Sequence, residues 1–384
     1  MFRQSNYQNR FQSNKDEPLK LKINLSAISN NWHIMNKLSG NARTAAVVKD
    51  NAYGLGLEQI SKSLYKAGAK DFFVKNIEEG IKLRDYVKKA NIFVLSEDNI
   101  GQERSLIEAN LIPVLYSSNQ LKLYSQLLSN HQSHCYALQI DTGFNRLGLS
   151  IDEALSFAEN FDNKNQINNK LSLIISHLAC AENQNSPMNA SQLNKFMSIA
   201  TKYQGIEASL SASAGIFLGK EYHFQLTRPG IALYGGTYAI NKLHPMRTVV
   251  TAEARIILIR TANAGEIVSY GGEKKLKRNS LIAVAAIGYC DGYPLSLSGI
   301  DHKDNISINN VGQGFIKGYK VPILGKITMD MTMFDITDCP GIEVGDYIQV
   351  FGPNIKLDDV ANASGTTNYE LLVQIGNKYA RHYI

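Results

Sequence analysis

A single lysine lies where an apolar run meets a glycine-rich segment, in the sequence AVVKDNAYGLG at residues 46–56. The apolar residues 45–48 predict a buried strand, and Gly54 and Gly56 interrupt it before apolar residues return at helical spacing. We therefore expect Lys49 at the carboxyl end of a strand. A partly desolvated amine in such a place can form a Schiff base with an aldehyde such as pyridoxal phosphate.

An alternative interpretation is that Lys49 only reaches from the strand end into solvent and that the glycines only make a turn. For a segment that had only a strand, a lysine and glycines in common with this one, that interpretation would be the better one. Here the residues from Lys49 to Gly56, with Tyr53 among them, closely resemble the cofactor-lysine signature of the alanine racemases, a pyridoxal-phosphate family built on a barrel. The resemblance implies pyridoxal 5'-phosphate as the cofactor, with Lys49 as the residue that carries it.

The composition limits the class of protein. With 384 residues, 44% of them hydrophobic, the chain can bury a large core and can form two domains. Its four cysteines have no CxxC spacing, which argues against a disulfide framework and a metal site and indicates a reducing, cytoplasmic compartment. The formal charge of +6 is spread along the chain, so we expect no nucleic-acid partner.

Residues 1–18 are polar and rich in Asn and Gln, and we expect them to form a disordered extension. No apolar core follows their positive charges, and the chain has no unbroken apolar run long enough to span a bilayer. We therefore expect neither a secretory signal nor contact with a membrane.

Eight short apolar runs predict strands, and amphipathic stretches lie between them. The runs begin at Thr44, Asp71, Asn91, Ile112, Tyr136, Leu171, Glu207 and Pro229. Eight strand–helix units in about two hundred residues indicate an α/β fold, a parallel (β/α)8 barrel of the TIM type over residues 19–245, with its active site at the carboxyl ends of the strands. A doubly wound open sheet is the competing architecture, and periodicity does not exclude it.

Residues 246–384 have a different pattern, with strand-like runs, Gly, Asn and Pro turns and little helical spacing. They predict a mostly β carboxyl-terminal domain. The run at residues 21–28 also predicts a strand, which could pair with this second domain rather than with the barrel. Within the barrel, Asn76 followed by Glu79 predicts a helix N-cap with a capping box.

The resemblance also implies how the cofactor phosphate is bound. The residues that match phosphate contacts of the family are Tyr53, Ser213, the backbone N–H groups of Gly230 and Ile231, and Tyr369. Hydroxyl and amide groups at a glycine-containing loop suit a dianion.

Arginine and histidine residues complete the implied cofactor site. Arg228, in RPGIALYGG, matches the arginine that faces the pyridine nitrogen; because a guanidinium stays protonated, this nitrogen would remain an acceptor and transamination would be disfavoured. Arg146, in DTGFNRLGL, matches an arginine near the phenolic oxygen and the substrate carboxylate. His177 matches a histidine packed between the pyridine-facing arginine and the catalytic tyrosine. Gln139 replaces a carbamylated lysine found in many members, so either its amide or a bound anion would position Arg146.

Inversion at an α-carbon requires two proton-transfer groups on opposite faces of the substrate. The resemblance implies Lys49 on one face and Tyr270, in GEIVSYGG, on the other. These two residues lie in different predicted domains, and in the family they meet because two subunits pair head to tail. We therefore expect a homodimer with shared active sites. The resemblance implies that the subunit that contributes Tyr270 also contributes Tyr289 and Met329. Tyr289 and Tyr369 would narrow the entrance, and the Met329 N–H would bind the substrate carboxylate.

The resemblance extends over about residues 20–384 and implies interconversion of L-alanine and D-alanine by a two-base mechanism on an external aldimine, which supplies D-alanine for peptidoglycan. A broad-spectrum amino-acid racemase on the same fold is the alternative. A barrel-type decarboxylase of basic amino acids would carry a Gly-rich phosphate loop and a Cys–Glu segment that this chain lacks. A non-catalytic cofactor-binding barrel would not need the second domain.

Overall fold

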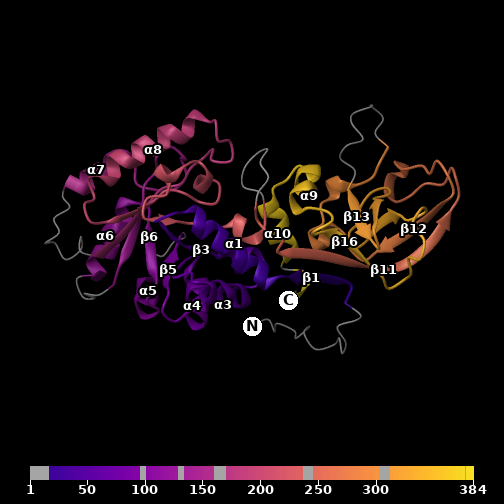
Figure 1. Cartoon of the computed structure of the whole chain (residues 1–384), viewed down its shortest axis with the longest axis horizontal. Coiled ribbons are helices and arrows are strands. Elements are labelled where there is room, and N and C mark those ends of the chain that lie inside the picture. Colours follow the sequence, from indigo (N-terminus) through magenta and orange to yellow (C-terminus); the bar gives the residue numbers. More distant parts are fainter. Residues whose placement is uncertain are drawn as a thin grey trace. The chain divides into compact units, whose positions relative to one another are not determined.

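The computed structural model describes residues 17–95, 101–128, 134–159, 170–236, 245–301, 312–376 and 378–384. The described residues form two compact units (Figure 1). The first unit is Leu25–Arg247, and the second unit joins the residues up to Asn24 to Thr248–Ile384.

The extension expected at the amino terminus is only partly described. Residues 1–16 lie outside the described residues. Glu17 and Pro18, which we expected in the same extension, are bound to the second unit. The Tyr347 hydroxyl donates to the Glu17 carbonyl at 2.6 Å, and the Arg255 N–H donates to the Pro18 carbonyl at 2.8 Å.

The strands of the first unit are short and parallel. They are β2 (Arg43–Thr44), β3 (Ala46–Val47), β4 (Asp71–Val74), β5 (Asn91–Val94), β6 (Ile112–Leu115), β7 (Tyr136–Gln139), β8 (Leu171–Ile175), β9 (Glu207–Ser209) and β10 (Leu226–Thr227). β3 to β9 pair in sequence order, and β10 pairs with β2, which continues into β3.

Backbone hydrogen bonds close these strands into a barrel. On one side of the last strand, the Ala45 N–H donates to the Thr227 carbonyl at 2.9 Å; on the other, the Arg228 N–H donates to the Ser211 carbonyl at 2.9 Å. The last strand is therefore bonded both to the first strand and to the one before it, which is the closed arrangement of a (β/α)8 barrel. The predicted barrel is confirmed, and the doubly wound sheet is wrong because an open sheet leaves its two edges unpaired.

The eighth strand differs from the prediction. We expected it to begin at Pro229, but β10 ends at Thr227, and Ile231–Tyr234 form the 3₁₀ helix η4. Gly230, with φ −121° and ψ −90°, turns the chain out of the strand. The residues of η4 are apolar because the turn is buried, and a short apolar run does not distinguish a strand from a buried helical turn.

One helix precedes the first barrel strand, and the others lie between the strands. They are α1 (Leu25–Leu38), α2 (Lys49–Tyr53), α3 (Leu57–Ala67), α4 (Ile77–Tyr86), α5 (Glu103–Glu108), α6 (Ser118–Leu128), α7 (Ile151–Glu159) and α8 (Pro187–Ala200). The barrel strands consist largely of buried apolar residues, as expected for parallel strands covered by helices.

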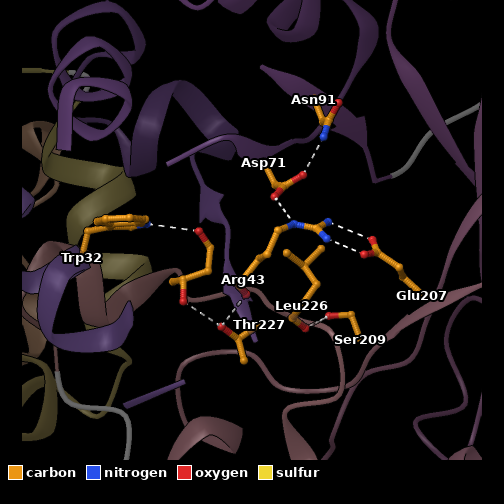
Figure 2. Close-up of polar contacts among 9 residues, drawn as sticks. Trp32, Arg43, Asp71, Asn91, Glu207, Ser209, Leu226 and Thr227 are labelled. Atoms are coloured by element: carbon orange, nitrogen blue, oxygen red, sulfur yellow. Dashed lines mark hydrogen bonds and ion pairs between the residues drawn. The ribbon is translucent and has the colours of Figure 1, made fainter. Parts of the chain in front are cut away.

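An ionic cluster joins the amino ends of three barrel strands. Figure 2 shows Arg43 of β2 between Asp71 of β4 and Glu207 of β9. The Arg43 Nε lies 3.1 Å from the Asp71 carboxylate, and Asn91 of β5 donates to the same carboxylate at 2.8 Å. This end of a barrel contributes to stability rather than to catalysis, which belongs to the carboxyl ends.

The second unit is mostly β, as predicted. Its elements are β1 (Leu19–Ile23), β11 (Val250–Ala262), β12 (Ser280–Ala285), β13 (Gln313–Ile316), β14 (Tyr319–Pro322), β15 (Thr332–Asp335), β16 (Tyr347–Phe351), β17 (Ala380–Tyr383), α9 (Leu357–Ser364) and α10 (Asn368–Gly376). β1 pairs antiparallel with β11 and parallel with β17, so this strand lies in the second unit and not in the barrel. The sequence had left this pairing open. The predicted strand at residues 21–28 is wrong in its second half, because β1 ends at Ile23 and α1 begins at Leu25.

The described ranges lack two features. No helix in them is long and apolar enough to cross a membrane. The same ranges contain no group of three or more His, Cys, Asp or Glu residues arranged to bind a metal ion.

Candidate active site

Lys49 lies two residues after the end of β3, at the strand end predicted from the sequence, and begins α2. The residues after it form one turn of left-handed helix: Asp50, Asn51 and Ala52 have φ of 53–54° and ψ of 45–55°. Tyr53 continues the turn with φ 56°. Left-handed helical backbone costs about 1–2 kcal/mol per non-glycine residue. The turn after Lys49 is therefore strained and must be held by contacts outside it.

Tyr53, Ser213 and Gly230 come together beside the carboxyl end of β10. The buried Ser213 Oγ accepts the N–H groups of Gly230 at 2.9 Å and Ala232 at 3.2 Å. A Cβ at position 230 would lie 2.3 Å from the Tyr53 hydroxyl, so only glycine lets this hydroxyl reach the start of η4. Ile231 lies between the two bonded amides. The group of hydroxyls and amides has the donors that a phosphate needs.

Arg228 follows β10 and is 5% exposed. Its guanidinium donates to the Ser209 hydroxyl and to the carbonyl oxygens of Ser176, at 2.6 Å, and Leu210, at 3.5 Å. All three acceptors are uncharged, and no carboxylate pairs with Arg228 in the part of the chain that the structure describes. Burial lowers the pKa of Arg228 to about 10. A buried cation without a carboxylate is unfavourable unless further acceptors reach it, and a pyridine nitrogen is such an acceptor.

His177 lies beyond β8 among positive charges. Burial, followed by the charges of Arg228, Arg146 and Lys49, lowers its pKa to about 3. The imidazole is therefore neutral at physiological pH. The structure thus brings Lys49, Arg146, His177 and Arg228 together at the carboxyl ends of the barrel strands. The positive charges of the lysine and the two arginines favour an anionic ligand.

The loop that carries Arg146 is organised by Asp141. Burial alone would raise the pKa of this carboxyl, but backbone N–H groups of the loop bind it and together lower the pKa below its usual value. Those of Gly143 and Arg146 donate at 2.7 and 3.1 Å. The Gln139 amide donates to the Leu147 carbonyl at 2.8 Å, so it positions the loop backbone beside Arg146. We expected either the Gln139 amide or a bound anion to position Arg146. The Arg146 guanidinium lies over the Phe144 ring, 4.3 Å from the ring centre.

The remaining predicted residues belong to the second unit. Tyr270 lies in the 3₁₀ turn η5 (Tyr270–Gly272) and is 71% exposed. It borders a cavity of about 800 Å³ lined by β11, β12 and the segment 265–270. Tyr289 and Met329 are brought together, because the Tyr289 N–H donates to Thr328 at 3.0 Å and a Cβ at Gly288 would strike the Met329 carbonyl.

Tyr369, the last of these predicted residues, is the second residue of α10 and is 38% exposed. All four residues that we expected at the substrate end of the site therefore present exposed side chains on the second unit. The expected cofactor residues lie in the barrel, except for Tyr369, which we also expected to contact the phosphate.

Sequence reasoning missed two contributors to the barrel site. Ala232 supplies the second amide to Ser213; its position two residues after a glycine, in a run interpreted as a strand, concealed this. Glu79 accepts the Asn51 N–H of the left-handed turn at 2.7 Å, although its spacing from Asn76 indicated only a capping box. No local signal identifies either contact, because each joins segments distant in sequence.

Comparison with known proteins identifies relatives over nearly the whole chain. The family model for the alanine racemase N-terminal domain matches residues 23–238, and that for the C-terminal domain matches residues 249–383. The biosynthetic alanine racemase of Agrobacterium fabrum is 50% identical, covering 96% of this chain and 94% of that protein. The alanine racemase of Rhizobium meliloti is 45% identical, covering 95% and 96%.

Solved structures agree. The alanine racemase of Bartonella henselae with covalently bound pyridoxal phosphate superimposes with a TM-score of 0.87 at 32% identity, covering 96% of this chain and 99% of that one. The biosynthetic alanine racemase of Pseudomonas aeruginosa gives a TM-score of 0.85 at 27% identity, with coverage of 96% and 99%. The chain therefore belongs to the alanine racemase family.

Proposed function

We propose that this protein is an alanine racemase, which interconverts L-alanine and D-alanine with pyridoxal 5'-phosphate by a two-base mechanism. The observation that carries the proposal is the group formed by Lys49, the neutral His177 and the buried Arg228, whose charge no carboxylate of the described residues balances. Such a group suits a cofactor that combines an aldehyde, an aromatic nitrogen and a phosphate.

The residues present fit that cofactor. Lys49 supplies the amine for its aldehyde. We assign the phosphate to the hydroxyls of Tyr53, Ser213 and Tyr369 and to the backbone N–H groups of Gly230 and Ile231. The Gly230 N–H donates to the Ser213 Oγ in this structure, so the phosphate would share it with that oxygen. When bound, pyridoxal phosphate supplies an electron sink that makes the α-proton of an amino acid acidic.

Arg228 limits the reaction to proton exchange. A guanidinium remains protonated at neutral pH even with a pKa of about 10, and it has no acceptor of its own. It can therefore donate a hydrogen bond to the ring nitrogen but cannot accept one, which leaves that nitrogen unprotonated. This arrangement disfavours transamination. Arg146 would lie near the phenolic oxygen and the substrate carboxylate.

Lys49 and Tyr270 serve as the two bases, one on each face of the substrate α-carbon. In the D-to-L direction the neutral Lys49 amine removes the α-proton and the Tyr270 hydroxyl donates a proton to the opposite face. In the L-to-D direction the Tyr270 phenolate removes the proton and the protonated Lys49 amine donates one. His177, as a neutral imidazole, can hydrogen-bond a tyrosine hydroxyl without competing for the proton.

The exposure of Tyr270 supports a shared site in a head-to-tail homodimer. A base needs a position shielded from water, and Tyr270 is 71% exposed on the second unit. Large apolar side chains near it in sequence are also exposed, at 45% for Ile257 and 64% for Ile267. Exposed apolar groups of this kind mark an interaction surface, and the barrel of a second copy would cover it.

The substrate end of the site suits a small side chain. Tyr289 and Tyr369 narrow the entrance, and the Met329 N–H binds the substrate carboxylate. We further propose a cytoplasmic enzyme that supplies D-alanine for peptidoglycan; the four cysteines are free thiols, which suits a reducing compartment.

A substrate panel tests the proposal. Purified protein with added pyridoxal phosphate is assayed for racemisation of alanine, serine, lysine and arginine, with Lys49→Ala as the negative control. We expect alanine to react much faster than the others. Comparable rates on lysine and arginine would identify a broad-spectrum racemase instead, and no racemisation of any substrate would refute both.

A further inference from the structure

The left-handed turn after Lys49 requires support from outside. Asp50, Asn51, Ala52 and Tyr53 all have positive φ, and a conformation that L-residues disfavour does not persist over four positions without contacts that favour it. The same turn separates Lys49 from Tyr53, so its geometry decides where the amine and the hydroxyl point.

Glu79 provides that support from a neighbouring strand–helix unit. Its Oε1 accepts the Asn51 N–H at 2.7 Å, in the middle of the turn, and its Oε2 accepts the Lys75 N–H at 3.0 Å. The carboxylate thus joins the end of β4 to the turn after β3. Both bonds are charge-assisted, the stronger class of hydrogen bond.

The predicted capping box is correspondingly wrong in one half. Asn76 caps α4, since its Oδ1 accepts the Glu79 N–H at 3.0 Å. In a capping box the Glu79 carboxylate would return to the Asn76 N–H, but both of its oxygens bind elsewhere. Glu79 is therefore used for the lysine turn and not for its own helix end.

Other contacts assist, but they are local or weaker. The Asn51 Oδ1 accepts the Leu57 N–H at 2.9 Å, which joins the turn to α3. An ion pair between Lys75 and Asp50 spans 3.5 Å at partly exposed side chains, where water screens it.

We propose that Glu79 is a positioning residue for Lys49: it holds the left-handed turn and so sets the direction of the lysine amine and the Tyr53 hydroxyl. The inference rests on the proposed role of Lys49 as the cofactor-binding residue. Without the Glu79 carboxylate, the Asn51 N–H loses its acceptor and the strained turn relaxes toward ordinary backbone, which moves both side chains.

The test compares Glu79→Gln with Glu78→Gln. Glutamine is isosteric but presents an NH₂ group to one of the two N–H donors. Glu78 is the adjacent, exposed residue of α4, so its variant removes the same charge from the same helix end. Cofactor-free protein is mixed with pyridoxal phosphate, and its attachment to Lys49 is followed by visible absorbance and verified by borohydride trapping and peptide mapping. We expect attachment about tenfold slower in Glu79→Gln, as one lost charge-assisted bond implies, and unchanged in Glu78→Gln.

A glycine rescue separates positioning from general stability. Ala52 is fully buried with φ 54°, and glycine adopts this conformation without strain. We expect Ala52→Gly to restore most of the attachment rate to Glu79→Gln. Ala154→Gly, which also replaces a fully buried alanine but within the right-handed α7, is the matched control and should not restore it. Thermal unfolding of each cofactor-free variant is measured in parallel.

The outcomes distinguish this inference from the proposed function. If the unaltered protein attaches no pyridoxal phosphate at Lys49, the proposed function fails. If it does and Glu79→Gln attaches it at the same rate, or if Ala154→Gly rescues as well as Ala52→Gly, Glu79 is not a positioning residue. Should Glu79→Gln alone fail to fold, the Ala52→Gly/Glu79→Gln variant is expected to fold and attach the cofactor, and an unfolded double variant would overturn the inference.

Discussion

Gly230→Ala is expected to weaken cofactor binding through Tyr53. The added Cβ would lie 2.3 Å from the Tyr53 hydroxyl, whereas ordinary contact begins near 3.4 Å, so the hydroxyl must withdraw by about 1 Å. The φ of Gly230 is −121°, so its backbone is not left-handed, and we attribute the effect to the Cβ contact.

The expected magnitude follows from the hydrogen bond that is lost. A hydroxyl bond to a phosphate is charge-assisted and contributes about 1.5–3 kcal/mol, which corresponds to a dissociation constant for pyridoxal phosphate roughly 10- to 100-fold higher. Tyr53→Phe removes the same hydroxyl directly and is the comparison. Because both changes remove one interaction, the double variant should bind no more weakly than the worse single variant.

Cofactor affinity is measured by titrating cofactor-free protein with pyridoxal phosphate and following intrinsic fluorescence. If Gly230→Ala binds with unaltered affinity while Tyr53→Phe binds weakly, the close approach of Tyr53 to Gly230 does not govern the phosphate site. If the two effects are additive, Gly230 acts by another route.

Three further predictions concern the dimer, the ionic cluster around Arg43 and the dependence of stability on pH. Lys49→Ala and Tyr270→Phe should each be inactive. Subunit exchange between the two variants should restore about a quarter of full activity, because half the dimers are mixed and each mixed dimer has one intact site out of two. No recovery of activity after verified exchange would refute shared sites. Arg43→Met should lower the free energy of unfolding, measured by urea titration, by about 2 kcal/mol, because it leaves the 2%-exposed Asp71 carboxylate without its cation. This loss is smaller than that for a fully buried ion pair, because Arg43 is partly exposed and water screens its charge. Adding Asp71→Asn should recover part of the loss. Burial, and then neighbouring positive charges, lower the pKa of His177 to about 3. Between about pH 6.5 and pH 3 the unfolded chain therefore binds one proton more than the folded chain, and the free energy of unfolding of cofactor-free protein should fall by up to about 1.4 kcal/mol per pH unit as the pH falls. A His177→Asn variant whose free energy of unfolding depends on pH with the same slope would refute this.

Much of the barrel was accessible from local patterns. The runs beginning at Asp71, Asn91 and Leu171 became strands at those residues, because a continuous apolar run between helices fits a strand buried on both faces. The prediction of a strand beginning at Pro229 was wrong, because the residues of η4 are as apolar and buried as those of a strand. The closure of the barrel was not visible locally, because it depends on a bond between Ala45 and Thr227, which are far apart in the chain.

The family followed from the sequence, whereas the physical state of the proposed site did not. The position of Lys49 between an apolar run and glycines is a local property of the sequence, and the resemblance over about residues 20–384 predicted the family, which the relatives confirm. Only the tertiary structure decided that the turn after Lys49 is left-handed, since the Glu79 carboxylate that accepts its Asn51 N–H comes from another strand–helix unit. The state of Arg228, buried against neutral acceptors only, is likewise set by Ser176 and by residues 209–210, because burial and hydrogen-bond partners are properties of the packed chain.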